Sequence, residues 1–173
     1  MTKNTLIRFR NFVLLVLVQV LIFSRIHLFG YATACIYIIF IIKLPRHTTR
    51  NELLIWSFLF GLCVDMFCNT PGINAAAATL LGFVRNPLLS AFAHKGIPDD
   101  FIPGARSLKW SRYIVYSVLC TSIFFTALFI LEAFTVANPL MLLISAVSST
   151  LLTMLFTIVT EFFSSQQDRK SVV

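Results

Sequence analysis

Two ionisable residues stand inside apolar stretches of the sequence, and they are the first candidates for chemistry. Asp65 lies in the run Leu53–Asn69, and Arg85 lies in the run Gly72–Phe92. Charged groups at membrane depth are costly and are functional candidates by default. If the two runs form an antiparallel helical hairpin, the two side chains lean toward each other, and we expect a direct or water-bridged pair. The alternative is that each charge reaches its own membrane surface.

Small and polar residues flank these two charges on the predicted hairpin. On the second helix of the hairpin, the small and polar residues recur at spacings of three and four, which places them on one face. On the first helix, Gly61 lies one turn before Asp65. Small residues let helices approach closely in lipid. Pro71 followed by Gly72 suits a type II turn, and Asn74 is then expected to cap the second helix. The resulting polar seam, which serves either packing or binding, comprises Gly61, Asp65, Gly72, Asn74, Ala78, Gly82 and Arg85.

Groups for known enzymatic chemistry are scarce in the rest of the chain. The four cysteines lie in apolar runs without a C-x-x-C pair, and we expect them to be small buried hydrophobes. The three histidines fall on predicted loops on both sides of a membrane, so they do not converge on a metal. Neither a Walker loop nor a G-x-G-x-x-G motif is present. We therefore expect no catalytic residue, cofactor or metal site, and we expect Gln19 to form an interhelical hydrogen bond.

The composition is typical of a helical membrane protein. Of 173 residues, 58% are apolar and 12% are charged, and the mean hydropathy is +0.86. A soluble domain carries about 25% charged residues. Apolar runs such as 142–159 do not alternate in polarity, as barrel strands would. The length fits one domain, residues 1–173, and the partners that this composition implies are membrane lipid rather than nucleic acid.

Six apolar segments are long enough, or nearly so, to cross a bilayer core of about 30 Å. The first two are short. The predicted fold is therefore an all-α, polytopic membrane protein with six transmembrane helices in one bundle. The predicted spans are Asn11–Ser24, Phe29–Leu44, Leu53–Asn69, Gly72–Phe92, Lys109–Phe134 and Asn138–Phe163.

The basic residues predict the orientation of these spans. With the N-terminus inside, twelve of the 14 Lys and Arg residues fall on inner segments, one falls outside and Arg85 lies within a span, as the positive-inside rule requires. The cytoplasmic segments are then residues 1–10, the loop 93–108 and the tail 164–173. Ala32 to Cys35 resembles a signal-peptide or lipoprotein cleavage site. Because Arg25 and His27 interrupt the apolar path to it, we expect an uncleaved first span.

The order of several short motifs resembles the MreD family of rod shape-determining membrane proteins, in particular its Bacteroidetes branch. The resemblance covers nearly the whole chain. In this sequence, Ala34 stands where the family often has proline, which leaves a kink there in doubt. The matching elements are Gln19, Phe29–Tyr31, Gly61–Asp65, Gly72, Ala75–Ala78, Phe83–Arg85 and Leu131–Phe134.

This resemblance implies a non-catalytic component of the elongation machinery that inserts peptidoglycan along the cylinder of a bacterial cell, located in the inner membrane. The implied partners are the bitopic protein MreC, the actin-like MreB, a RodA-type glycosyltransferase and its transpeptidase. The implied helix arrangement is similar to the substrate-binding subunit of energy-coupling-factor transporters. We expect a lipid-facing groove to receive the single transmembrane helix of the MreC-like partner.

The alternative hypothesis is a small-molecule carrier subunit, such as a vitamin-binding component of a transporter. Such a subunit would place Asp65, Asn74 and Arg85 around a pocket at the midplane of the membrane. A carrier site usually has more converging polar groups than this chain offers. An intramembrane enzyme is the third hypothesis, and the scarcity of reactive groups disfavours it.

Overall fold

The computed structural model describes residues 10, 12–23, 35–68, 70, 72–93, 101–133 and 139–170, and these ranges contain helices and no strands. Residues 12–18 are α-helical and continue into a π-helical turn. A backbone in lipid must satisfy its own hydrogen bonds, which favours helices for apolar segments of this kind. The elements are η1 (Gln19–Phe23), α2 (Tyr37–Lys43), α3 (Arg50–Cys68), α4 (Ile73–Phe92), α5 (Ala105–Leu108), α6 (Trp110–Ala133) and α7 (Pro139–Lys170).

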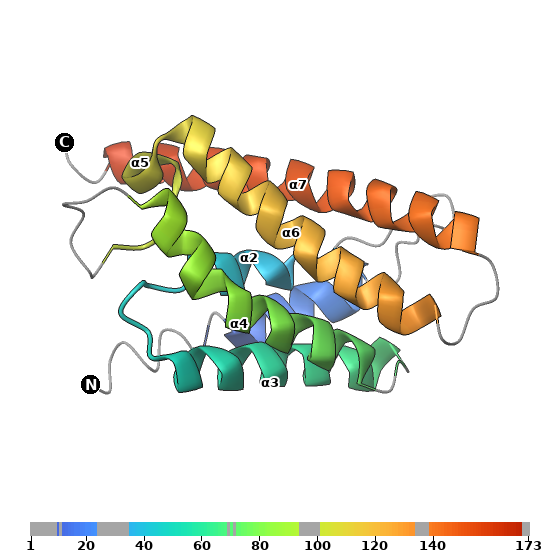
Figure 1. Ribbon diagram of the computed structural model, residues 1–173. Coiled ribbons are helices and arrows are strands. Elements are labelled where there is room, and N and C mark those ends of the chain that lie inside the picture. The colour runs from blue at the N-terminus through green and yellow to red at the C-terminus, as the bar shows by residue number, and fades with distance from the viewer. Residues whose placement is uncertain are drawn as a thin grey trace.

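Four of these helices are long and apolar enough to cross a membrane: α3, α4, α6 and, within α7, the stretch Ile144–Phe162. They lie lengthwise in one bundle, in which α3 packs on α4, α4 on α6 and α6 on α7 (Figure 1). Their positions confirm the last four predicted spans to within a few residues at most ends. The main difference is α7, which continues as a helix to Lys170.

The first two predicted spans have a different form in the described residues. The N-terminal apolar helix, Phe12–Leu21, is shorter than the four long ones. The seven residues of α2 extend about 10 Å at 1.5 Å per residue, a third of a bilayer core. Residues 24–34, which include the start of the predicted second span, lie outside the described part of the chain. The structure thus has four helices of spanning length among its described residues.

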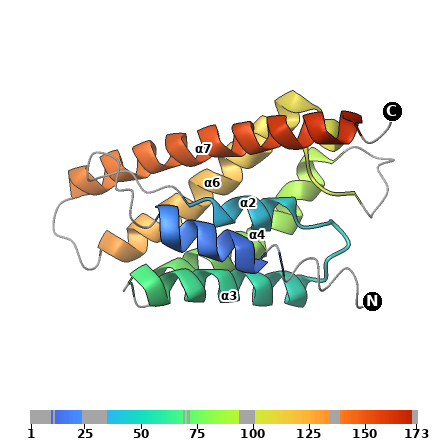
Figure 2. The same ribbon diagram turned by 180° about the vertical axis from the view of Figure 1, so that it is seen from behind.

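The short helix α2 lies in the interior of the bundle, between the α3–α4 pair and the α6–α7 pair, in both views (Figures 1 and 2). Tyr37, Ile38, Ile41 and Ile42 on this helix are completely buried. The helix ends before Pro45, as predicted, because a residue that precedes proline avoids helical geometry, and Leu44 is extended with ψ of 142°.

One end of the bundle gathers the connection between α2 and α3, the end of α4, the short α5 and the start of α6 (Figure 2). We call it the basic end, because its connections and the adjoining helix ends carry basic residues, namely Lys43, Arg46, Arg50, Lys109 and Arg112. The opposite end holds the turn from α3 to α4. A backbone hydrogen bond from Arg46 N to Phe101 O, 3.1 Å long, ties two connections of the basic end together.

Candidate functional site

The carboxylate of Asp65, on α3, binds the backbone N–H groups at the start of α4. Its Oδ1 accepts hydrogen bonds from Asn74 N (3.0 Å) and Asn74 Nδ2 (3.0 Å), and from Thr70 Oγ1 (2.7 Å). Its Oδ2 accepts from Ala75 N at 2.8 Å. The first backbone N–H groups of a helix lack partners within that helix, and a negative charge is stabilised at this end. A side chain from the preceding helix therefore supplies the cap.

The positive φ predicted for Gly72 is confirmed, whereas the cap predicted at Asn74 is wrong. Gly72 has φ of 81° and ψ of −2°, close to the values for the third residue of a type II turn. Gly72 occupies the N-cap position, and Asp65, from the preceding helix, supplies the acceptors for the first backbone N–H groups of α4. The Asn74 amide instead donates to Thr70 Oγ1 at 3.1 Å, and its Oδ1 accepts from the Tyr37 hydroxyl at 3.1 Å.

Arg85 performs the opposite task at the end of α2. Its Nη2 donates to the carbonyl oxygen of Leu44 and, at 3.3 Å, to that of Ile42, while its Nη1 donates to Asn86 Oδ1 at 2.9 Å. The last carbonyls of a helix have no intrahelical donor, and a cation is favourable there. Arg85 is completely buried, so this guanidinium satisfies backbone groups that water cannot reach.

The expected pair between Asp65 and Arg85 is not formed. Each side chain has the partners given above, and no ion pair or hydrogen bond joins the two. Arg85 follows Asn74 by eleven residues, which is about 16 Å along α4. Both side chains are enclosed by protein, since Asp65 is 5% and Arg85 0% exposed. Both charges bind helix termini.

This separation predicts additive mutational effects. Asp65→Ala and Arg85→Ala should each destabilise the protein, and the double mutant should equal their sum to within about 0.5 kcal/mol, as for distant sites without shared partners. The measurement is a double-mutant cycle on unfolding by SDS in mixed micelles. A coupling energy well above that limit would mean that the two charges meet.

The start of α2 is also capped by side chains from other elements. Ile36 N donates to Gln19 Oε1 at 2.8 Å, and Cys35 N donates to Thr153 Oγ1, on α7, at 3.3 Å. Gln19 is buried and begins η1. The prediction that Gln19 bonds between helices is therefore confirmed. Together with Arg85 of α4 at the other end, side chains of η1 and α7 thus supply hydrogen bonds to backbone groups at both ends of α2.

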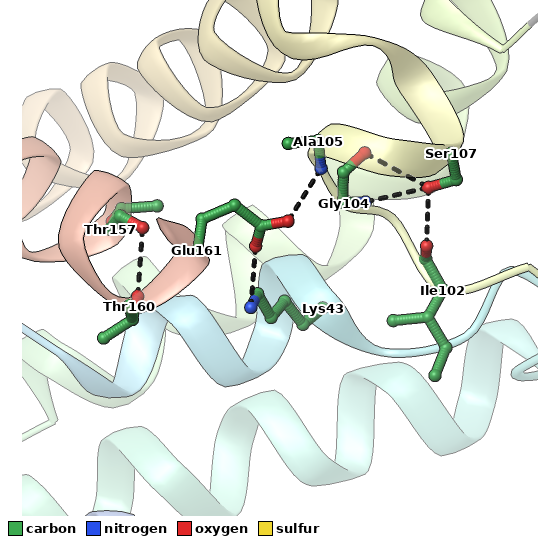
Figure 3. A network of polar contacts seen from close by, with 8 residues as sticks. All are labelled: Lys43, Ile102, Gly104, Ala105, Ser107, Thr157, Thr160 and Glu161. Atoms are coloured by element: carbon green, nitrogen blue, oxygen red, sulfur yellow. Dashed lines mark hydrogen bonds and ion pairs between the residues drawn. The ribbon is translucent and has the colours of Figure 1, made fainter. Parts of the chain in front are cut away.

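A carboxylate that the sequence reasoning missed, Glu161, joins three elements at the basic end (Figure 3). Its Oε1 accepts from Ala105 N, at the start of α5, at 2.7 Å. Its Oε2 forms an ion pair with Lys43 Nζ, at the end of α2, at 2.7 Å. A Cβ atom on Gly104 would lie 2.9 Å from Oε1, so the glycine leaves room for the carboxylate. Glu161 thus fastens the α5 segment and α2 to α7.

A sequence signal for Glu161 was available in the last span. Polar residues recur there every four positions, and all are buried: Ser149, Thr153 and Thr157 are 0% exposed and Glu161 is 5% exposed. A period of four marks one face of a helix, which here faces the bundle. Thr157 Oγ1 donates to Thr153 O at 2.8 Å, so part of the stripe is satisfied within α7 itself.

Six of the seven residues predicted for the seam between α3 and α4 are buried, whereas the seventh, Gly72, is exposed. On α4, Asn74, Ala78, Gly82 and Arg85 are all buried. A Cβ atom on Gly61 would lie 2.4 Å from Ala75 Cα, and one on Gly82 would lie 2.5 Å from Ser57 Oγ. The two glycines therefore permit the close approach of the helices, which is the packing role of small residues in lipid.

The polar side chains described here bind backbone groups of their own chain at several separate helix ends. They do not converge on one location, and within the described residues no three His, Cys, Asp or Glu side chains are placed to hold a metal ion. The four cysteines are free, and Cys35 and Cys120 are buried. The hydrogen bonds of these side chains fix the short and long helices relative to one another.

Comparisons of the chain with protein-family models, curated proteins and solved structures find no match.

Proposed function

We propose that this protein is a non-catalytic scaffold of the machinery for bacterial cell elongation, as its sequence resemblance to the MreD family implies. The structural observation that supports this proposal is the use of the intramembrane polar groups. Asp65, Gln19, Arg85 and Glu161 each bind the end of a helix of the same chain. A scaffold needs a rigid shape at membrane depth, and buried polar contacts of this kind supply it.

The same observation disfavours the carrier hypothesis. A carrier would direct Asp65, Asn74 and Arg85 into one midplane pocket. Asp65 and Asn74 instead bond to each other at the start of α4, and Arg85 is engaged at the end of α2. Side chains that already bind groups of their own chain at two separate helix ends do not converge on one solute, as the polar groups of a binding pocket do.

We further propose that the membrane topology has six segments, with both termini in the cytoplasm. In this arrangement, residues 12–23 and the segment of α2 form the first two, short segments, and the basic end faces the cytoplasm. The basic residues on the connections and helix ends there support this orientation. The likeness to the substrate-binding subunit of energy-coupling-factor transporters belongs to the same proposal.

The proposed partner is a bitopic, MreC-like membrane protein whose single helix packs on the lipid-facing side of the bundle. Large apolar side chains are exposed there on every long helix, and those of α3 include Phe58, Met66 and Phe67. Aromatic side chains offer a large contact area. MreB, a RodA-type glycosyltransferase and its transpeptidase would join through the same assembly. Membrane lipid covers the remaining surface.

Affinity purification from native membranes, with identification of the proteins that co-purify, tests this function. We expect an MreC-like protein, and we expect its recovery to persist when its extracytoplasmic domain is deleted, because the contact is between membrane helices. Recovery of transporter ATPases in its place would support the carrier hypothesis. Loss of association on deletion of that domain would exclude a contact made by the membrane helix.

A further inference from the structure

The short helix α5 and the long helix α6 are separated by one residue, Lys109, whose backbone is strained. Among the residues that the structure describes, Lys109 is the one non-glycine residue with a positive φ. Its φ of 66° and ψ of 145° lie in a region that residues with a Cβ atom rarely adopt. Such a conformation persists only where surrounding contacts enforce it. Lys109 is exposed, so these contacts must come from its neighbours.

The local sequence favours a continuous helix through this joint. Lysine is a good helix former, and residues 105–133 contain neither glycine nor proline. If Lys109 took helical angles, α5 and α6 would join, and the amides of Ser111 and Arg112 would donate to the carbonyls four residues earlier. Instead, α6 begins with the bond from Tyr113 N to Lys109 O, which is 3.0 Å long. The break therefore costs helical hydrogen bonds in addition to the strain.

Tertiary contacts hold α5 away from that continuous path. We call residues 101–108 the strap. Glu161 Oε1, on α7, accepts from Ala105 N at 2.7 Å (Figure 3), and Arg46 N donates to Phe101 O at 3.1 Å. Ala105 is 3% exposed and belongs to the hydrophobic core. The strap is thus docked on the bundle by a side chain of α7 and by the connection after α2.

The strap also has hydrogen bonds of its own, which do not depend on its docking. Ser107 Oγ accepts from Gly104 N at 3.0 Å and donates to Ile102 O at 2.8 Å. Leu108 N donates to Gly104 O at 3.0 Å. Because these bonds lie within the strap, they allow it to move as one body about Lys109.

We propose that the strap is a conformational switch of the basic end, with Lys109 as its hinge and Glu161 as the residue that docks it. In the docked state, one carboxylate oxygen of Glu161 binds the strap and the other binds Lys43 of α2. In the released state, Lys109 takes helical angles, α5 extends α6, and the buried face of the strap, with Ala105 and Leu108, is uncovered. Strain and helical bonds favour release and tertiary contacts favour docking, so a change in one contact shifts the balance.

Hydrogen–deuterium exchange of the full chain in detergent, read at single residues by mass spectrometry, tests the hinge. Glycine adopts a positive φ without steric cost, and it also disfavours the continuous helix, so Lys109→Gly should stabilise the docked state. We expect the Ala105 amide of this variant to exchange about fivefold more slowly or less rapidly still than in the natural protein. Unchanged or faster exchange would overturn the proposal, because the hinge would then store no strain.

Glu161→Ala tests the docking contact by the same measurement. Loss of the acceptor should raise the exchange rate of the Ala105 amide by about tenfold or more. The amides of Ser111 and Arg112 should exchange more slowly, because the continuous helix supplies their acceptors. A faster Ala105 amide without slower exchange at these two positions would show a strap that frays rather than switches, and it too would overturn the proposal.

Two further variants on α7 serve as controls. Thr157 lies one turn before Glu161, is 0% exposed and bonds through Oγ1 to Thr153 O within α7, so Thr157→Ala should leave the strap amides unchanged. Equal effects of Thr157→Ala and Glu161→Ala would assign the change to α7 as a whole and contradict the switch. Glu161→Gln keeps an acceptor for Ala105 N but loses the ion pair with Lys43, so its effect should be smaller in the same direction. It provides the test if the Ala variant fails to fold, and exchange identical to the natural protein would count against docking by Glu161.

Discussion

Asp65→Ala is expected to lower the free energy of unfolding by about 2–6 kcal/mol. The carboxylate accepts from the backbone N–H groups of Asn74 and Ala75, and loss of a buried partner costs about 1–3 kcal/mol for each donor left unsatisfied. The site is 5% exposed, so water cannot readily replace the lost acceptor. The measurement is SDS-induced unfolding in mixed micelles, followed by the loss of helical circular dichroism.

Asp65→Asn is the matched variant, and it separates a structural role from a chemical one. An asparagine keeps one acceptor oxygen, but its amide group would face a backbone donor, so we expect a stability between those of the Ala variant and the natural protein. A proton-carrying or catalytic aspartate would behave differently, since Asn would abolish activity while stability and partner binding stayed intact. Unchanged stability of Asp65→Ala would show that the cap at α4 is dispensable.

Gly61→Ala is expected to destabilise the protein by about 3 kcal/mol or more, and to weaken partner capture as a consequence. The added Cβ would lie 2.4 Å from Ala75 Cα, 2.5 Å from Asn74 O and 2.6 Å from Ala75 N. These atoms belong to the backbone, so the helices must separate, and overpacking of a tight contact typically costs about 1–3 kcal/mol or occasionally more. The separation would also pull Asn74 and Ala75 from the carboxylate that caps α4.

Two other glycines of the seam provide graded controls for the Gly61 variant. A Cβ on Gly82 would meet Ser57 Oγ at 2.5 Å, which a side-chain rotation relieves, so Gly82→Ala should cost about 1 kcal/mol. Gly72 has no atom within 4 Å of an added Cβ but has φ of +81°, so Gly72→Ala should cost about 1–2 kcal/mol from backbone strain alone. If the three variants were equally stable, the close approach at Gly61 would not limit packing.

Local sequence patterns predicted the features that depend on neighbours in the chain. Apolar length predicted the four long helices, since a helix is the conformation that satisfies its own backbone in lipid. The Pro-Gly pair in the sequence predicted the positive φ of Gly72. The period of small and polar residues predicted which face of α4 is buried, and the isolated Gln19 in an apolar run predicted an interhelical bond.

The partners of the charged residues depended on the tertiary structure. Counting residues from the ends of predicted spans brought Asp65 and Arg85 toward each other, but in the structure Asp65 lies beside the first turn of α4 and Arg85 lies beside the last carbonyls of α2. The sequence could not show that α2 is a seven-residue helix enclosed by protein, because its apolar residues suit lipid and a protein core equally. Helix ends enclosed in this way must obtain donors and acceptors from other segments, and only the packing of the whole chain decides which side chains reach them.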